Sequence, residues 1–106
     1  MSGKCYIAVD LGASSGRVIV GHVDSGRISL NVVHRFPVTS LVSAGHERWP
    51  LSVLIAEVRK GLTKAACAEG ELVSLGVDTW GVDYGLTDAD GRLLEDPVCY
   101  RDRRAD

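Results

Sequence analysis

Residues 6–20 read YIAVDLGASSGRVIV, and this stretch decides how the chain begins to fold. Residues 6–9 and 18–20 are short apolar runs of the kind that forms β-strands. Residues 10–16 between them are rich in glycine and serine, which are typical of turns. The stretch therefore predicts a β-hairpin around a loop of small polar residues.

The pattern predicts a third strand directly after this hairpin. Residues 24–27, DSGR, are typical of a turn, and apolar side chains then alternate with polar ones over residues 28–36. We expect this strand to fold back on the second one. Residues 37–48 show no sustained period, and we expect a surface loop there.

The hydrophobic period changes after Pro50 and indicates an amphipathic helix. Apolar residues recur there every three or four positions: Leu51, Leu54, Ile55, Val58, Leu62 and Ala65. Proline at the first turn and Gly70 beyond the end fit the usual boundaries of a helix. Residues 72–77 then form a mostly apolar run, which predicts a strand buried on both faces, as in a parallel pair.

The order of these elements predicts an α/β fold with a mixed sheet. Along the chain it is β-β-β-α-β plus a β-hairpin, the last formed by residues 84–87 and 93–94 around a turn at 88–91. A helical crossover makes the fourth strand parallel, and we place it beside the first. Residues 10–17 and 78–83 would then leave neighbouring strands at one edge of the sheet, where ligands of α/β proteins usually bind.

Composition excludes several classes of function. The 106 residues suit one domain, and 12 basic against 14 acidic residues give no basic surface for nucleic acid or anionic membranes. No run is long enough to cross a membrane or to act as a signal peptide. The cysteines Cys5, Cys67 and Cys99 are widely spaced, so we expect buried or half-buried free thiols, a cytoplasmic location and no structural metal.

Residues 10–17, DLGASSGR, combine groups that suit a phosphate. Glycine and alanine let the main chain approach a ligand closely, and the hydroxyls and backbone N–H groups can contact a phosphate. Asp10 could hold a hydrated Mg²⁺ ion, and Arg17 could add positive charge or pair with an acid. The alternative is a plain hairpin turn. A serine nucleophile in G-x-S-x-G is disfavoured, because a strand rather than a helix follows the motif.

Residues 78–83, DTWGVD, place two carboxylates around a tryptophan and a glycine. A sugar has apolar C–H faces and polar edges, so an aromatic face with nearby acceptors suits it. The alternative is a turn at the end of a strand with Trp80 in the core. We expect His34, Trp49 and Tyr100 to be strand-face or loop-anchor residues. We expect residues 101–104, RDRR, to be solvated or ion-paired.

Four segments together resemble the FGGY carbohydrate kinase family. They are residues 8–17 (AVDLGASSGR), 34–36 (HRF), 78–83 (DTWGVD) and 100–104 (YRDRR). The resemblance implies a ribonuclease-H-like (actin-like ATPase) mixed sheet, here truncated. Residues 1–106 would be the amino-terminal part of the first kinase domain, without the second domain. No catalytic residue is expected among them, since the resemblance places the general base beyond Asp106. The resemblance therefore also implies that this chain is inactive by itself.

The resemblance also implies a role for each candidate residue. Phosphates of ATP would bind at Ala13, Ser14, Ser15, Gly16 and Arg17, and Asp10 would help to hold Mg²⁺. Gly81 would lie in the sugar-binding turn, with Asp78, Thr79, Trp80 and Asp83 as its neighbours. The expected reaction converts L-rhamnulose and ATP to L-rhamnulose 1-phosphate.

Two alternatives to this reaction remain open. One is a kinase for a related ketose or polyol, and the other is a non-catalytic binding module with the same sheet. The chain departs from the family at Trp49-Pro50, where Trp-Asp is usual, so the helix would lose its acidic cap. Self-association through the uncovered edge of the sheet is also expected.

Overall fold

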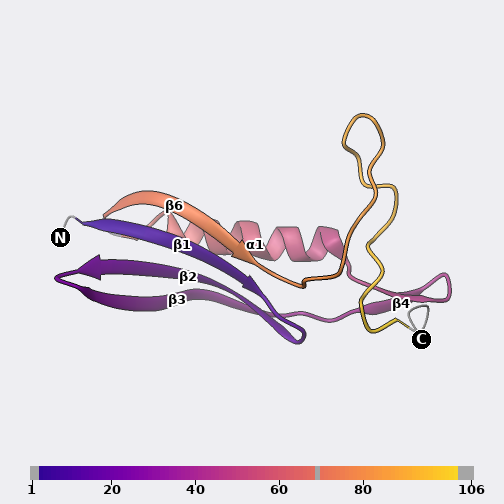
Figure 1. Cartoon of the computed structure of the whole chain (residues 1–106), viewed down its shortest axis with the longest axis horizontal. Coiled ribbons are helices and arrows are strands. Elements are labelled where there is room, and N and C mark those ends of the chain that lie inside the picture. The colour runs from indigo at the N-terminus through magenta and orange to yellow at the C-terminus, as the bar shows by residue number, and fades with distance from the viewer. Residues whose placement is uncertain (1–2, 69, 103–106) are drawn as a thin grey trace.

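The computed structural model describes residues 3–68 and 70–102. Strands β1 (Lys4–Leu11) and β2 (Ser15–Asp24) form an antiparallel hairpin, and β3 (Arg27–Pro37) folds back on β2. Helix α1 (Leu51–Ala65) then leads to β6 (Glu71–Asp78), which lies parallel to β1. The sheet order is β3-β2-β1-β6 (Figure 1). The predicted hairpin, third strand, helix and parallel fourth strand are confirmed.

The structure corrects the loop expected at residues 37–48. This segment contains a second small sheet of β4 (Leu41–Ser43) and β5 (His46–Arg48), joined by a tight turn. Ala44 and Gly45 both have positive φ angles in this turn, 52° and 81°. Arms of three residues are too short to show the alternation by which a strand is recognised in a sequence.

Helix α1 packs on β2 and β3 and covers one face of the sheet. The core beneath it comprises the buried residues Cys5, Ile7, Val9, Val18, Val20 and Ala65. Gly61 lets the helix approach β2 closely, because a Cβ atom there would lie 2.7 Å from the Cβ of Val18. A second cluster lies beside this core and comprises Phe36, Val38, Trp49, Leu54 and Cys99.

A polar contact also fixes α1 to β3. The Nζ atom of Lys64 donates to Nδ1 of His34 over 2.9 Å, which leaves Nε2–H to donate to Glu57 over 2.7 Å. The hydrogen bond from His34 holds the pKa of Glu57 below its ordinary value of 4.5, with a further contribution from Lys60. His34 is therefore a strand-face residue, as expected.

The prediction that residues 72–77 are buried on both faces is wrong. All eight residues of β6 are exposed. The reason is that α1 packs over β2 and β3, and that β6 is the edge strand of the sheet within the described residues. The sheet face opposite α1 is also apolar, with a hollow of about 240 Å³ lined by residues that include Ile19, Ile28 and Leu30.

The remaining expectations concern the second hairpin, the helix start and the cysteines. The hairpin is short, with Thr87 paired to Leu93. Pro50 offers no side-chain cap, but the carboxylate of Asp96 accepts a hydrogen bond from the N–H of Leu51 over 3.3 Å. Contrary to expectation, Cys67 is exposed. The one helix found in the described residues is not long and apolar enough to cross a membrane.

Candidate functional site

The two polar segments predicted to share an edge of the sheet, residues 10–17 and 78–83, start next to each other. β1 and β6 run in the same direction and end together, with Asp10 paired in register to Asp78 (Figure 1). The hairpin loop that follows β1 and the turn that follows β6 therefore start from neighbouring strands. We call residues 10–17 the hairpin loop and residues 78–83 the β6 turn.

Asp10 and Arg17 face each other across the base of the hairpin loop. Arg17 Nη1 donates to Asp10 Oδ2 over 2.6 Å, and Arg17 Nη2 donates to the hydroxyl of Ser15 over 2.9 Å. Both charged side chains are about one-third exposed. Arg17 Nε is buried and has no hydrogen-bond partner within residues 3–68 and 70–102. The pair thus retains an unmet donor and stays accessible to solvent.

The backbone of the hairpin loop is held through its carbonyl oxygens. Ser14 O accepts from the N–H of Val38 over 3.0 Å, and Ser15 O accepts from the N–H of Gly12 over 2.9 Å. Ala13 O lies 3.5 Å from Nη2 of Arg101. In a trans peptide the N–H points away from the carbonyl, so the Ser14 and Ser15 N–H groups point away from these contacts. Neighbouring N–H groups of this kind can bind an anion.

This arrangement fits a phosphate and a hydrated magnesium ion. The loop offers backbone N–H groups, exposed small residues at Ala13 and Ser14, and a carboxylate at Asp10. Gly16 has a packing role as well, because a Cβ atom there would collide with the ring of Phe36. The hairpin-turn interpretation and the phosphate interpretation are therefore compatible for the same loop.

The β6 turn is held mainly by Trp49, which precedes α1. Trp80 stacks on Trp49 with ring centroids 4.1 Å apart and planes 7° apart. The Trp49 indole Nε1 donates to Asp83 Oδ2 over 2.5 Å. Asp78, Thr79 and Gly81 are exposed, whereas Trp80 and Asp83 are half-buried. The structure thus brings Asp78 beside Asp10 and ties Trp80 and Asp83 to Trp49.

Arg101 is a residue that the sequence did not single out for the site. Its guanidinium lies 5.8 Å from the ring centroid of Trp49 and 5.5 Å from that of Tyr100. It also lies 4.0 Å from Glu47, and a hydrogen bond with Cys99 raises the pKa of the guanidinium. Ala13 and Arg101 are 88 positions apart, so no local pattern could have predicted their contact.

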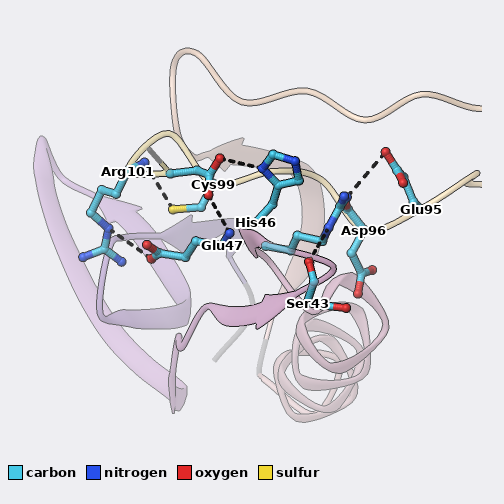
Figure 2. Close-up of polar contacts among 9 residues, drawn as sticks. Ser43, His46, Glu47, Glu95, Asp96, Cys99 and Arg101 are labelled. Atoms are coloured by element: carbon cyan, nitrogen blue, oxygen red, sulfur yellow. Dashed lines mark hydrogen bonds and ion pairs between the residues drawn. The ribbon is translucent and has the colours of Figure 1, made fainter. Parts of the chain in front are cut away.

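Asp102 anchors the same segment to β5, of which Figure 2 labels His46 and Glu47. It is 6% exposed, accepts a hydrogen bond from the N–H of Glu47 over 2.7 Å and pairs with Nδ1 of His46 at 2.9 Å. Arg101 meets the expectation of an ion-paired residue, because its guanidinium lies 4.0 Å from the carboxylate of Glu47, whereas Asp102 is buried rather than solvated. Residues 103 and 104 lie outside the described part of the chain.

The expected position of the general base is not tested by the structure. The resemblance places this group beyond Asp106, the last residue of the sequence. Asp106 itself lies outside the described residues, which end at position 102. The location of the base therefore stays a prediction.

The chain matches known proteins along nearly its whole length. It is 46% identical over 101 residues to a rhamnulokinase of Ligilactobacillus salivarius, 48% to one of Lactiplantibacillus plantarum and 40% to one of Bacillus subtilis. This chain is similar to rhamnulokinases. Each match covers 95% of the chain, which spans 21% of the length of each of these three rhamnulokinases.

The structural comparison supports the fold. The chain superposes on a gluconate kinase from Lactobacillus acidophilus with a TM-score of 0.71 and 15% identity, over 92% of this chain and 20% of that kinase. At this identity the likeness concerns the fold alone, and it confirms the α/β class with a mixed sheet. No family model matches the chain. The resemblance carried by the four motifs is confirmed by the rhamnulokinase matches.

Proposed function

We propose that this chain forms part of an ATP-dependent carbohydrate kinase that converts L-rhamnulose to L-rhamnulose 1-phosphate. The main support is the register of Asp10 with Asp78, which starts the hairpin loop and the β6 turn side by side. The similarity to rhamnulokinases supports L-rhamnulose as the substrate, because 95% of the chain matches at 46 and 48% identity. Free cysteines fit a cytoplasmic location, which is part of the same proposal.

In this proposal the hairpin loop binds the phosphates of ATP. The N–H groups of Ser14 and Ser15 and the side chain of Arg17 contact phosphate oxygens, with Ala13 and Gly16 allowing close approach. Asp10 helps to hold Mg²⁺, which when bound neutralises charge on the phosphates. Arg17 must then turn part of its hydrogen bonding from Asp10 to the phosphate.

The β6 turn binds the sugar in this proposal. Gly81 lies in open space, with no atom within 4 Å of a Cβ built on it, so its backbone is accessible to a ligand. Asp78 and Thr79 are exposed beside it and provide acceptors and a hydroxyl. Trp80 and Asp83 shape the turn from beneath. Phosphoryl transfer depends mainly on positioning and charge stabilisation, which these two loops would provide for one side of the reacting groups.

A chimera tests this function. Residues 1–106 replace the matching segment of the Lactiplantibacillus plantarum rhamnulokinase, and phosphorylation is followed by ADP release and by phosphorus NMR of the sugar product. We expect formation of L-rhamnulose 1-phosphate that depends on both ATP and L-rhamnulose. The 106-residue chain alone is the control and should show no turnover, because its loop and turn form one exposed wall.

The same experiment separates the alternatives. If a folded chimera accepts only another ketose or a polyol, that compound replaces L-rhamnulose as the proposed substrate. A folded chimera without any kinase activity would contradict the proposal, and ATP binding by the 106-residue chain would then favour a non-catalytic binding module. Substantial phosphorylation by the chain alone would contradict the proposal that this chain supplies only one side of the active site.

We also propose that the isolated chain self-associates through β6. The strand is apolar, exposed and at the sheet edge, and such edges pair with other chains. Light scattering should show a mass that rises with protein concentration, and Leu75→Lys should lower it. Val82→Lys adds the same charge at an exposed residue outside the strand and should have little effect. A monomer at every concentration would contradict self-association.

A further inference from the structure

Trp49 connects the β6 turn to the rest of the molecule. It is 1% exposed and belongs to the second core cluster, together with Phe36 and Leu54. Its backbone N–H donates to the carbonyl of Pro97 over 2.9 Å, so the residue is held on the backbone side as well. A buried ring with a fixed backbone provides a rigid support for the residues that pack against it.

Two residues of the β6 turn, Trp80 and Asp83, contact the Trp49 ring. Trp80 stacks on it nearly in parallel, and Asp83 accepts the hydrogen bond from its indole N–H. Gly81 and Val82 lie between these two residues and are exposed. The stack and the hydrogen bond therefore fix the ends of the segment that presents the backbone of Gly81 to solvent.

The contacts with Trp49 leave polar atoms of the turn unmet. Asp83 uses Oδ2 for Trp49, whereas Asp83 Oδ1 and Trp80 Nε1 are buried and have no hydrogen-bond partner in the part of the chain that the structure describes. One of these atoms is an acceptor and the other a donor, which a hydroxyl group or a water molecule could satisfy. The turn is thus held in place without using all of its own hydrogen-bonding capacity.

We propose that Trp49 is a positioning residue for the sugar-binding turn, acting through its stack on Trp80 and its hydrogen bond to Asp83. The inference rests on the proposed function for the identity of the ligand. The indole N–H of Trp49 meets the β6 turn directly, whereas the link from Trp49 to the hairpin loop runs through Arg101, which lies 5.8 Å from its ring and 3.5 Å from Ala13 O. Loss of its indole N–H should therefore affect sugar binding selectively.

The first test needs no ligand. Trp49→Phe keeps an aromatic ring against Trp80 but removes the donor, and Asp83→Asn weakens the acceptor from the other side. In the 106-residue chain, the free energies of unfolding of the two single variants and the double variant are measured with urea. We expect the double variant to be no less stable than the more damaged single variant, because both changes act on the same hydrogen bond. Additive losses would overturn the direct link.

The second test uses the chimera. Trp49→Phe should raise the KM for L-rhamnulose about tenfold, the order expected when a hydrogen bond that orients a binding group is lost, and should leave the KM for ATP within about twofold. Asp83→Asn should give the same selective change. Phe36→Leu is the matched control, because Phe36 is a buried aromatic residue of the same cluster that packs against Gly16 instead.

The outcomes separate this inference from the proposed function. Equal changes in both KM values, or none, would overturn the positioning role while leaving the kinase assignment intact. A selective rise in the KM for L-rhamnulose in Phe36→Leu would also overturn it, because any loss of core packing would then suffice. If the unsubstituted chimera is inactive, the proposed function fails and the urea experiment decides whether Trp49 and Asp83 act together.

Discussion

Asp10→Asn in the chimera is expected to lower kcat/KM for L-rhamnulose phosphorylation by a factor on the order of 1,000, the scale seen when a charge-stabilising group is removed from an active site. Asparagine keeps the shape of the side chain but removes its negative charge. In the proposal this charge helps to hold Mg²⁺ beside the phosphates. Asp10 also sits opposite Arg17 and next to Asp78, so the change acts where both loops begin.

The effect on folding should be small and can be measured separately. The Asp10–Arg17 pair is about one-third exposed, and ion pairs at such sites add little to stability. Asp24→Asn is the matched control, because Asp24 is an exposed aspartate at the other end of β2. It should retain full activity. An Asp10→Asn chimera with near-normal kcat/KM would remove Asp10 from the proposed metal site.

Much of the sheet was predictable because its signals are local. The apolar runs on either side of residues 10–16, the alternation over residues 28–36 and the helical period after Pro50 each occur within about a dozen residues. The parallel pairing of β1 with β6 also followed, since a helical crossover between neighbouring strands gives a parallel pair. The shared edge of the candidate site was thus inferred from the order of elements alone.

The burial of β6 and the support of the β6 turn could not be predicted, because both depend on distant residues. The apolar composition of β6 predicted burial, but whether a strand is covered depends on where α1 packs, and it packs over β2 and β3. The support of the β6 turn by Trp49 was missed for a similar reason. Trp49 and Asp83 are 34 positions apart, and no sequence pattern indicates that an indole N–H meets a carboxylate across that distance.

Gly61 shows the same limit within the helix, and Gly61→Ala is expected to lower the free energy of unfolding. Alanine is the better helix former by about 1 kcal/mol, so sequence alone predicts stabilisation. In the structure, however, the new methyl group would lie 2.7 Å from the Cβ of Val18 and 3.3 Å from the Cβ of His34. Val18 is fully buried in the core, so it has little room to move.

Overpacking of a core typically costs about 1–3 kcal/mol, against a gain of about 1 kcal/mol in helix propensity, so we expect a net loss of up to about 2 kcal/mol. Urea unfolding of the 106-residue chain measures it. Gly76→Ala is the matched control in β6, because a Cβ atom there meets nothing within 4 Å, and its stability should stay close to that of the parent. If Gly61→Ala instead raised the stability, α1 would have to sit farther from β2 than the structure places it.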